Sequence, residues 1–240
     1  NNNQSFIKMI WKNNISENFN WGQEISNIDQ KEIVAKKISK LVQDSQTIGI
    51  GSGSTAFLAL KHIAQKVKEE QLTIKVIPTS YEIELACTYL GLTLTTLQQE
   101  RPDWYFDGAD EVDVDNNLIK GRGGAMFREK LLLMSSNKNY IIVDKSKMVT
   151  HLGEKFKVPI EVIPEAINYV RHSLVKMDIV TMDLRMATKK DGPVITENGN
   201  FILDVKFKKI ERTFEKNIKN IVGVIASGLF QNYDISIITP

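Results

Sequence analysis

"TIGIGSGSTAFLALKHIAQKVKEE", residues 47–70, joins a short apolar segment to a long amphipathic one through a turn rich in glycine and serine. Residues 47–50 predict a buried strand, and residues 55–70 predict a helix. The turn between them, "GSGSTA" at 51–56, opens the helix, where free backbone N–H groups carry positive partial charge. A strand, a glycine-rich turn and a helix in this order are typical of an α/β sheet that binds an anion.

The turn "GSGSTA" leaves several functions open. It fits the G-x-G-x-x-A pattern of dinucleotide-binding folds, but the next strand ends in "VIPTS" and offers no acid to hold a ribose. The Gly-Lys-Ser/Thr ending of a P-loop is also missing. On this stretch alone, a capped turn without function explains the pattern as well as a phosphate cradle does.

The alternation of strands and helices extends beyond this unit. Helices are expected at 29–44, 80–90 and 125–136, and strands at 74–77, 92–97, 103–106 and 139–144. Asp29 is the expected N-cap of the first of these helices. This rhythm predicts an α/β fold with a Rossmann-like, mainly parallel sheet and helices on both faces.

A different order of elements follows in the second half of the chain. Strands are expected at 158–163, 179–187, 201–207 and 222–226, and helices at 164–177 and 212–221. This β-α-β-β-α-β order predicts a smaller α+β domain of the ferredoxin-like kind over 154–230. A last strand at 233–240 returns to the first domain, which we place at 28–153 plus 231–240. Residues 1–27, rich in Asn, form an N-terminal extension.

Composition excludes several classes of protein. The 240 residues are 42% hydrophobic, enough for a real core, and the formal net charge of +2 gives no reason to expect a nucleic-acid partner. The only cysteine, Cys87, cannot form a disulfide within the chain and is expected in the core. No apolar run reaches the roughly 18 residues of a membrane span, and no signal peptide is recognisable. A cytoplasmic protein without membrane contact is therefore expected.

The acidic stretch "DWYFDGADEVD", 103–113, begins with a buried strand. Asp107 and Asp110 follow that strand and are separated by a Gly-Ala step, so a turn can direct both into one pocket. Ligands bind at this end of the strands in open parallel sheets. We therefore interpret these two acids as functional, and Glu111, Asp113 and Asp115 as a solvated acidic loop.

A calcium site is the first alternative for these acids. Counted from Asp113, an EF-hand loop needs Gly where Leu118 stands and Glu where Gly124 stands. A transition-metal site lacks a nearby cluster of His or Cys. Neither kind of metal site is favoured.

Basic residues and one further acid surround the second glycine-rich helix start, "KGRGGA" at 120–125. Lys120 and Arg122 bring positive charge close to the aspartates. Glu129 lies on the helix that follows, but its spacing alone predicts an ordinary solvated side chain. In "IIVDKSK", Lys147 is placed to reach a phosphate, and a solvated basic turn explains it equally well.

Taken in order, these segments resemble ribose-5-phosphate isomerase of the A type. The matching stretches are "GSGSTA", "DGADEVD", "KGRGGA", "REK" (128–130), "DKSK" (144–147), "VPIEVIP" (158–164) and "TENGNFILDV" (196–205). The similarity extends from about Asp29 to Pro240. Each motif alone is weak, whereas the ordered series is specific.

The resemblance implies a set of site residues. Glu129 is implied as the catalytic base and Lys147 as a substrate-binding lysine, and Lys31 in the first helix is a further candidate for the phosphate. The implied binding loops are Ser52, Gly53, Ser54 and Thr55; Asp107, Gly108, Ala109 and Asp110; and Lys120, Gly121, Arg122 and Gly123. Many relatives have Thr in place of Ser52, and some have Gly in place of Arg122.

The family interconverts ribose 5-phosphate and ribulose 5-phosphate with no metal or organic cofactor. By resemblance, Glu129 moves a proton from C2 to C1 through an enediolate, and Lys120 with the loop N–H groups stabilises the oxyanion. Asp107 and Asp110 bind hydroxyls and assist ring opening, and the phosphate orients the reacting carbons. The second domain resembles the family's lid, which forms interfaces, and so implies a homodimer or a homotetramer.

Two other functions compete with this one. A sugar-phosphate deaminase on a similar sheet needs an acid and a histidine near the sugar, but no histidine directly follows a strand of the first domain. A non-catalytic sugar-phosphate sensor needs a DNA-binding module, for which residues 1–27 are too few and too weakly basic. A sensor would also tolerate the loss of Glu129.

Overall fold

The computed structural model describes residues 24–240, which contain three β-sheets. The largest has six strands in the order β13-β7-β4-β1-β2-β3, and every neighbouring pair is parallel. Its strands are β1 (Thr47–Ile50), β2 (Lys75–Pro78), β3 (Thr93–Leu94), β4 (Trp104–Asp107), β7 (Asn139–Ile142) and β13 (Ser236–Ile238). The expected return of the chain's end to this sheet is confirmed.

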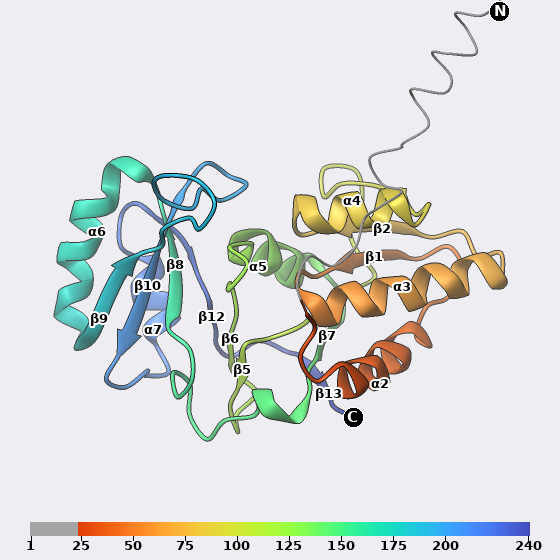
Figure 1. Ribbon diagram of the computed structural model, residues 1–240, viewed down its shortest axis with the longest axis horizontal. Coiled ribbons are helices and arrows are strands. Elements are labelled where there is room, and N and C mark those ends of the chain that lie inside the picture. The colour runs from red at the N-terminus through yellow and green to blue at the C-terminus, as the bar shows by residue number, and fades with distance from the viewer. Residues whose placement is uncertain (1–23) are drawn as a thin grey trace, which may run out of the picture.

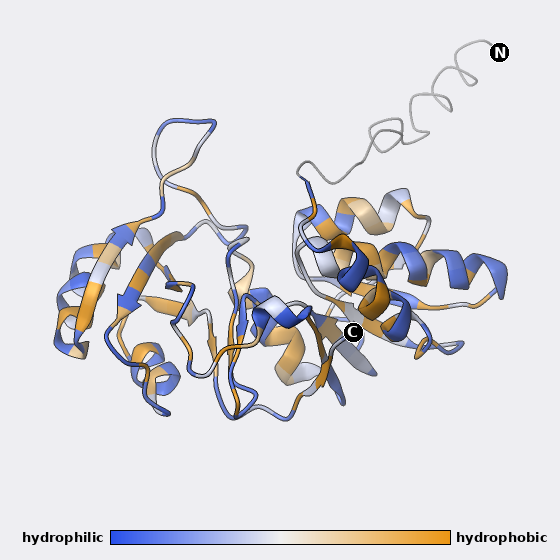
Figure 2. Cartoon of the chain, turned by 60° about the horizontal axis from the view of Figure 1, so that its bottom comes forward, coloured by the Kyte–Doolittle hydropathy of each residue, from blue (hydrophilic) through white to orange (hydrophobic). Residues whose placement is uncertain are grey.

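Four helices cover the two faces of this sheet. They are α2 (Ile28–Ser39), α3 (Ser54–Glu69), α4 (Tyr81–Tyr89) and α5 (Met126–Ser135). One core cluster packs Ile48 and Phe106 against α2, α3 and α4, whereas Tyr105 on the other face packs against Leu132 and Leu133 of α5. Figure 2 shows the helices with apolar and polar residues on opposite sides. The predicted α/β class with helices on both faces is confirmed.

The second sheet is antiparallel, with strand order β11-β8-β10-β9. Its elements are β8 (Val158–Val162), η3 (Pro164–Ala166), α6 (Ile167–Leu174), η4 (Val175–Met177), β9 (Ile179–Leu184), β10 (Phe201–Phe207), α7 (Phe214–Lys219) and β11 (Val224–Ser227). If these four strands are numbered along the chain, they lie side by side in the sheet in the order 4-1-3-2, as the predicted ferredoxin-like pattern requires. The expected helix at 164–177 is an α-helix between two 3₁₀ turns, the first of which starts at Pro164.

A third sheet lies between the other two in Figure 1 and was not predicted. It contains β5 (Glu111–Val112), β6 (Leu118–Ile119) and β12 (Leu229–Phe230), paired antiparallel. Strands of two residues are too short to show a period of alternating hydrophobicity, so the sequence pattern could not reveal them. The pairing of β6 with β12 brings residues 118 and 230 together.

Two expectations near the N-terminus need correction or stay open. Helix α2 begins at Ile28 after Asn27, which has a left-handed backbone with φ of 52°, so Asp29 lies in the first turn and is not the N-cap. Residues 1–23 of the predicted extension lie outside the described residues. The side-chain amide of Asn27 donates to Asp144 and to Ser146, each at 3.3 Å.

The strand expected at 92–97 is shorter than predicted and contains only residues 93 and 94.

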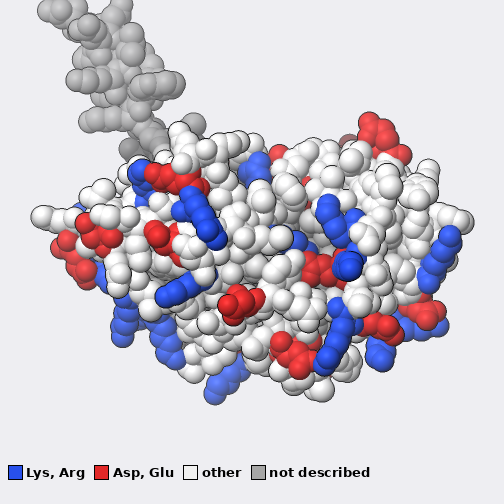
Figure 3. Space-filling model, turned by 180° about the vertical axis from the view of Figure 1, so that it is seen from behind, with Lys and Arg blue, Asp and Glu red and all other residues white. Residues whose placement is uncertain are grey.

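Between residues 24 and 240, none of the helices is both long and apolar enough to span a membrane. On the face shown in Figure 3, basic and acidic side chains alternate, in keeping with the small net charge. Cys87 is fully buried in the core, as predicted, and burial raises the pKa of its thiol to about 12.

Candidate active site

The candidate site lies at the point in the large sheet where successive strands stop being added on one side and start being added on the other. From β1 the chain proceeds to β2 and β3 on one side, and from β4 it proceeds to β7 and β13 on the other. The loops after the adjacent strands β1 and β4 therefore emerge side by side, which is where open α/β sheets bind ligands. Gly51 and Asp107 show how close these loops are, because a Cβ on Gly51 would overlap the carboxyl carbon of Asp107.

Asp107 is fully buried, and both of its carboxylate oxygens have partners. Oδ1 accepts a hydrogen bond of 2.7 Å from the Gly108 N–H, and Oδ2 accepts one from the Tyr105 hydroxyl. The ammonium nitrogen of Lys120 lies 2.8 Å from Oδ2 and donates to the Gly108 carbonyl at 2.5 Å. Asp107 thus fixes Lys120 in one position, as a buried charge requires a matched partner.

Glu129 projects from α5 into the same buried space. Only 3% of the residue is exposed, and Oε1 lies 3.5 Å from the Lys120 ammonium. Oε2 has no hydrogen-bond partner in residues 24–240. Burial raises the pKa of Glu129 from 4.5 to about 8; Lys120 opposes this rise, and the charges of Asp107 and Asp110 add to it. Spacing on this helix predicted a solvated Glu129. That prediction is wrong, because α5 directs the side chain at this position into the core.

Asp110 differs from Asp107 in keeping part of its surface exposed. Its Oδ2 accepts a hydrogen bond of 3.3 Å from the backbone N–H of Arg122. Burial raises the pKa of Asp110, although the charges of Lys120 and Lys147 oppose the shift. Of the two aspartates predicted to be functional, Asp110 is the one available to a ligand.

Lys31 lies beside the start of α3, within electrostatic range of two further cations, Lys147 and Arg122. The Lys31 ammonium donates to the Ser54 hydroxyl at 3.1 Å, although only 5% of Lys31 is exposed. Burial lowers the pKa of Lys31; Lys147 and Arg122 lower it further through their charge, and Asp144 opposes them. Lys147 ends the 3₁₀ turn η2 (Lys145–Lys147). A free helix N-terminus beside these cations suits a phosphate or another anion.

The remaining residues of the 52–55 loop, Ser52, Gly53 and Thr55, differ in their burial and in their hydrogen bonds. Gly53 has φ of 92° and open space where a Cβ would stand, whereas Thr55 is buried. The Ser52 hydroxyl is 2.7 Å from that of Thr79 and donates to that of Ser80 at 2.9 Å. Thr79 and Ser80 follow β2 and were missed. Their signal in the sequence is their position directly after a parallel strand, in "VIPTS" at 76–80.

The loop 120–124 is held from the second sheet. Gly121 has φ of 92°, and a Cβ there would lie 2.9 Å from Pro159. Arg185, which sequence reasoning also missed, donates to the carbonyl oxygens of Gly121 at 3.2 Å and Arg122 at 2.8 Å. Gly123 has open space where a Cβ would stand, and Ala109 packs against the core on the α5 side of the sheet. No local pattern in the sequence points from residue 185 to residue 121.

Glu111 corrects the expectation of a solvated acidic loop. It is fully buried and accepts backbone hydrogen bonds from Gly153, Lys155 and Phe156 at 2.6, 2.6 and 2.8 Å. Asp113 accepts from the N–H groups of residues 115 and 117 and so shapes the turn before β6. In residues 24–240, no three His, Cys, Asp or Glu side chains form a group suited to a metal.

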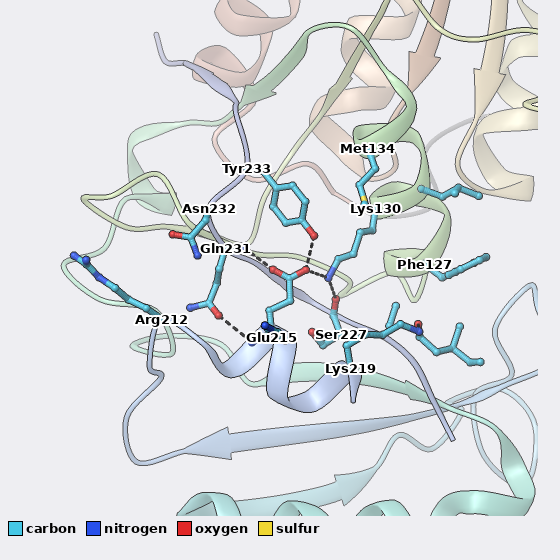
Figure 4. A pocket seen from close by; sticks show the side chains of 14 residues that line it. Phe127, Lys130, Met134, Arg212, Glu215, Lys219, Ser227, Gln231, Asn232 and Tyr233 are labelled. Carbon is cyan, nitrogen blue, oxygen red and sulfur yellow. Dashed lines mark hydrogen bonds and ion pairs between the residues drawn. The ribbon is translucent and has the colours of Figure 1, made fainter. Parts of the chain in front are cut away.

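A cavity of about 490 Å³ lies on the other side of α5 and contains none of the predicted site residues. Figure 4 shows Lys130 pointing across it to Glu215. The Lys130 ammonium lies 2.5 Å from Glu215 and donates to the carbonyls of Ser227 and Leu229, and the Tyr233 hydroxyl donates to Glu215 at 2.6 Å. These contacts anchor α5 and hence the backbone that carries Glu129.

Comparison with known proteins agrees with this geometry. The family model for ribose 5-phosphate isomerase A (phosphoriboisomerase A) matches residues 75–239. The ribose-5-phosphate isomerase A of Methanocaldococcus jannaschii is 43% identical over 213 residues, which are 88% of this chain and 93% of that protein. The chain belongs to the ribose-5-phosphate isomerase A family.

Solved ribose 5-phosphate isomerase structures share this architecture over most of the chain. The isomerase A from Methanocaldococcus jannaschii has a TM-score of 0.85 at 42% identity and covers 88% of this chain and 95% of its own. A D-ribose-5-phosphate isomerase in complex with phospho-erythronic acid has a TM-score of 0.84 at 38% identity and covers 88% of this chain and 94% of its own. The resemblance stated from the ordered motifs is therefore confirmed.

Proposed function

We propose that this chain interconverts D-ribose 5-phosphate and D-ribulose 5-phosphate by moving a proton between C2 and C1 through an enediolate, without a metal. The observation that carries the proposal is the pair of Glu129 and Lys120, a buried base and a buried cation 3.5 Å apart at the ligand-binding end of the sheet. The relatives that match most of the chain bear the name of this isomerase.

Glu129 is the proposed base. A carboxylate with a raised pKa is a stronger base than a solvated one, so it is better matched to removal of a proton next to a carbonyl. Oε2 has no partner in the described part of the chain and is free to accept that proton. The same carboxyl group then delivers that proton to C1, and the hydroxyl proton on the C2 oxygen moves to the C1 oxygen, which balances the conversion of the aldose to the ketose.

Lys120 is the proposed electrophile. The negative charge that develops on the enediolate oxygens needs a donor already in position, and Asp107 holds the ammonium there. Phospho-erythronic acid, found in the related structure, carries a carboxylate whose two oxygens resemble those of an enediolate. Such a ligand suits a site that places a cation beside the reacting oxygens.

Ring opening and phosphate binding involve different parts of the site. We assign hydroxyl binding and ring opening to the partly exposed Asp110, because both oxygens of Asp107 are engaged. The phosphate is held by Ser54, Lys31, Lys147 and the N–H groups at the start of α3. Binding energy from the phosphate orients C1 and C2 toward the base.

We further propose that residues 154–230 serve as a lid and as the surface that forms a homodimer or homotetramer. A contact with helix α4 of the first domain supports the lid, since Glu197 accepts a hydrogen bond of 2.6 Å from the N–H of Tyr81. Buried Glu161 holds that turn by accepting from Thr196 at 2.8 Å and Asn200 at 2.9 Å. Sedimentation equilibrium tests the assembly, and a monomer at micromolar concentration contradicts it.

The decisive experiment compares wild type with Glu129→Gln in EDTA, using ribose 5-phosphate. Wild type should isomerise the sugar, and the variant should lose about 10²-fold or more in kcat, as loss of a general base predicts. The variant should still bind phospho-erythronic acid. A wild type that binds ribose 5-phosphate without converting it would be a sensor or would act on another sugar. A wild type inactivated by EDTA would contradict the metal-free mechanism.

A further inference from the structure

Arg185 connects the second sheet to the candidate site, and the mechanism above does not use it. It follows β9 and forms a two-pronged ion pair with Asp204 of β10, with Nε and Nη2 at 2.8 and 2.5 Å from the two carboxylate oxygens. Its remaining nitrogen, Nη1, donates to the carbonyls of Gly121 and Arg122. A paired guanidinium of this kind is rigid and directional.

The contact with Gly121 involves one particular peptide group. The carbonyl oxygen of Gly121 accepts from Arg185, and the N–H on the other side of the same peptide bond, that of Arg122, donates to Asp110. Asp204, Arg185, this peptide and Asp110 therefore form one continuous chain of hydrogen bonds. Hydrogen bonds in such chains polarise each other, so a cation on the carbonyl strengthens the N–H as a donor.

Two backbone contacts also hold the loop, one at its start and one at the Gly121 carbonyl, which Arg185 therefore shares. The Lys120 N–H donates to the Gly228 carbonyl at 2.8 Å, and the Gly124 N–H donates to the Gly121 carbonyl at 3.0 Å. Among the described residues, the carbonyl of Arg122 has Arg185 as its hydrogen-bond donor. Asp110, Arg122, Arg185 and Asp204 also line one cavity of about 170 Å³.

We propose that Arg185 is a positioning residue that, together with Asp204, orients the Gly121–Arg122 peptide so that it holds Asp110 toward the sugar. This inference rests on the proposed isomerisation and adds to it a link from the second sheet to the acid that binds the hydroxyl. Arg185 itself does not touch the reacting carbons. It acts through one peptide group, and its effect therefore depends on the Asp110 carboxylate.

A double-mutant cycle tests this dependence. Arg185→Gln alone should lower kcat/KM by about 10- to 100-fold, the loss expected when a reacting group is displaced by about 1 Å. In an Asp110→Asn background, the same change should lower kcat/KM by less than about 3-fold, because the group it positions is already lost. Asp204→Asn should give the same two results. Arg185→Lys keeps the positive charge but loses the two-pronged guanidinium, and it should lower kcat/KM by less than Arg185→Gln does in the wild-type background.

A purely structural role gives a different result. Loosening of the fold would reduce kcat/KM by the same factor in both backgrounds, and that result would overturn the proposal, as would a loss below 3-fold for Arg185→Gln alone. Arg212→Gln is the matched control, since Arg212 is 84% exposed and pairs only loosely with Asp115. Its kcat/KM should equal that of wild type.

Failure of the proposed function would be recognised separately, as a wild type without isomerase activity. The cycle is then measured as affinity for phospho-erythronic acid by calorimetry. The same non-additivity between residues 185 and 110 is expected there, and additive losses of affinity would overturn the positioning role whether or not the protein is an isomerase.

Discussion

The Lys120 ammonium lies 3.5 Å from Oε1 of Glu129, and neither side chain is more than 4% exposed. Asp107 lies still closer to the same ammonium, at 2.8 Å. One buried cation thus neutralises two buried carboxylates only in part. This imbalance, together with burial, favours the protonated form of Glu129 and links the activity and stability of the protein to pH.

The activity should increase with pH through the neutral range. Glu129 acts as a base only when ionised, and burial raises its pKa to about 8. We expect kcat/KM to rise tenfold per pH unit well below that pKa and to level off above it. Initial rates measured from pH 4 to 9 check this. A half-maximum near 4.5, the usual value for a solvated Glu, would show that the base that limits the rate lacks the raised pKa of the buried Glu129.

Glu129 should also make the fold less stable as pH rises. Its pKa is raised in the folded state, so the folded chain binds the proton more tightly than the unfolded chain does. The stability from this group is complete below the unfolded pKa near 4.5 and is lost as pH rises through the folded pKa. The urea midpoint of Glu129→Gln minus that of wild type should therefore be larger at pH 8 than at pH 5. An equal difference at both pH values would refute the linkage.

Removal of Lys120 should damage both stability and catalysis. Lys120→Met leaves Asp107 buried without its cation, and a broken buried pair typically costs about 3–5 kcal/mol of unfolding free energy. Urea titration measures the loss, and Lys138→Met, at an exposed lysine, is the control. A stable variant with wild-type kcat would remove Lys120 from the mechanism.

Lys31 should affect substrate binding more than turnover. Its ammonium adjoins Ser54 and the charges of Lys147 and Arg122, so it contributes to the proposed phosphate site. Lys31→Met should raise KM by about 10- to 100-fold, equivalent to losing a charged hydrogen bond of about 1.5–3 kcal/mol, while kcat changes little. Competition by inorganic phosphate should weaken in parallel. If kcat falls and KM does not, Lys31 acts elsewhere.

Gly51 should tolerate no side chain. A Cβ at this position would overlap the carboxyl group of Asp107, which three contacts hold in place. Gly51→Ala should therefore lower the melting temperature and abolish measurable activity, because the strands β1 and β4 cannot separate without breaking their pairing. For stability, Gly123→Ala is the comparison, since its Cβ meets open space. Equal melting temperatures for the two variants would contradict the close approach.

The order of strands and helices could be predicted because each of the long elements carries its own signal. Residues 47–70 show a buried strand, a glycine-rich turn and an amphipathic helix with no reference to the rest of the chain. The β-α-β-β-α-β order after residue 154 was readable in the same way. The two-residue strands of the third sheet were not, because they are too short to show alternation and because the pairing of β6 with β12 joins residues about 110 positions apart.

The site was partly predictable for a related reason. Residues that directly follow parallel strands meet at one edge of the sheet, so Asp107, Asp110 and the 52–55 loop could be placed together from strand order alone. Spacing on α5 could not distinguish Glu129 from its neighbours, and only the family resemblance selected it. Thr79 and Ser80 also follow a parallel strand directly, whereas no local pattern pointed to Arg185.

By itself, the sequence determined which segments become strands and helices and which chain positions lie at the ligand-binding edge, because periodicity and turn chemistry are local properties. Only the tertiary structure decided which of two aspartates stays accessible, that Glu129 is buried beside Lys120, and that Arg185 reaches the Gly121–Arg122 peptide. Burial and charge pairing depend on groups brought together from distant parts of the chain. The pKa of a side chain and the orientation of a peptide are therefore set by folding, not by neighbours in sequence.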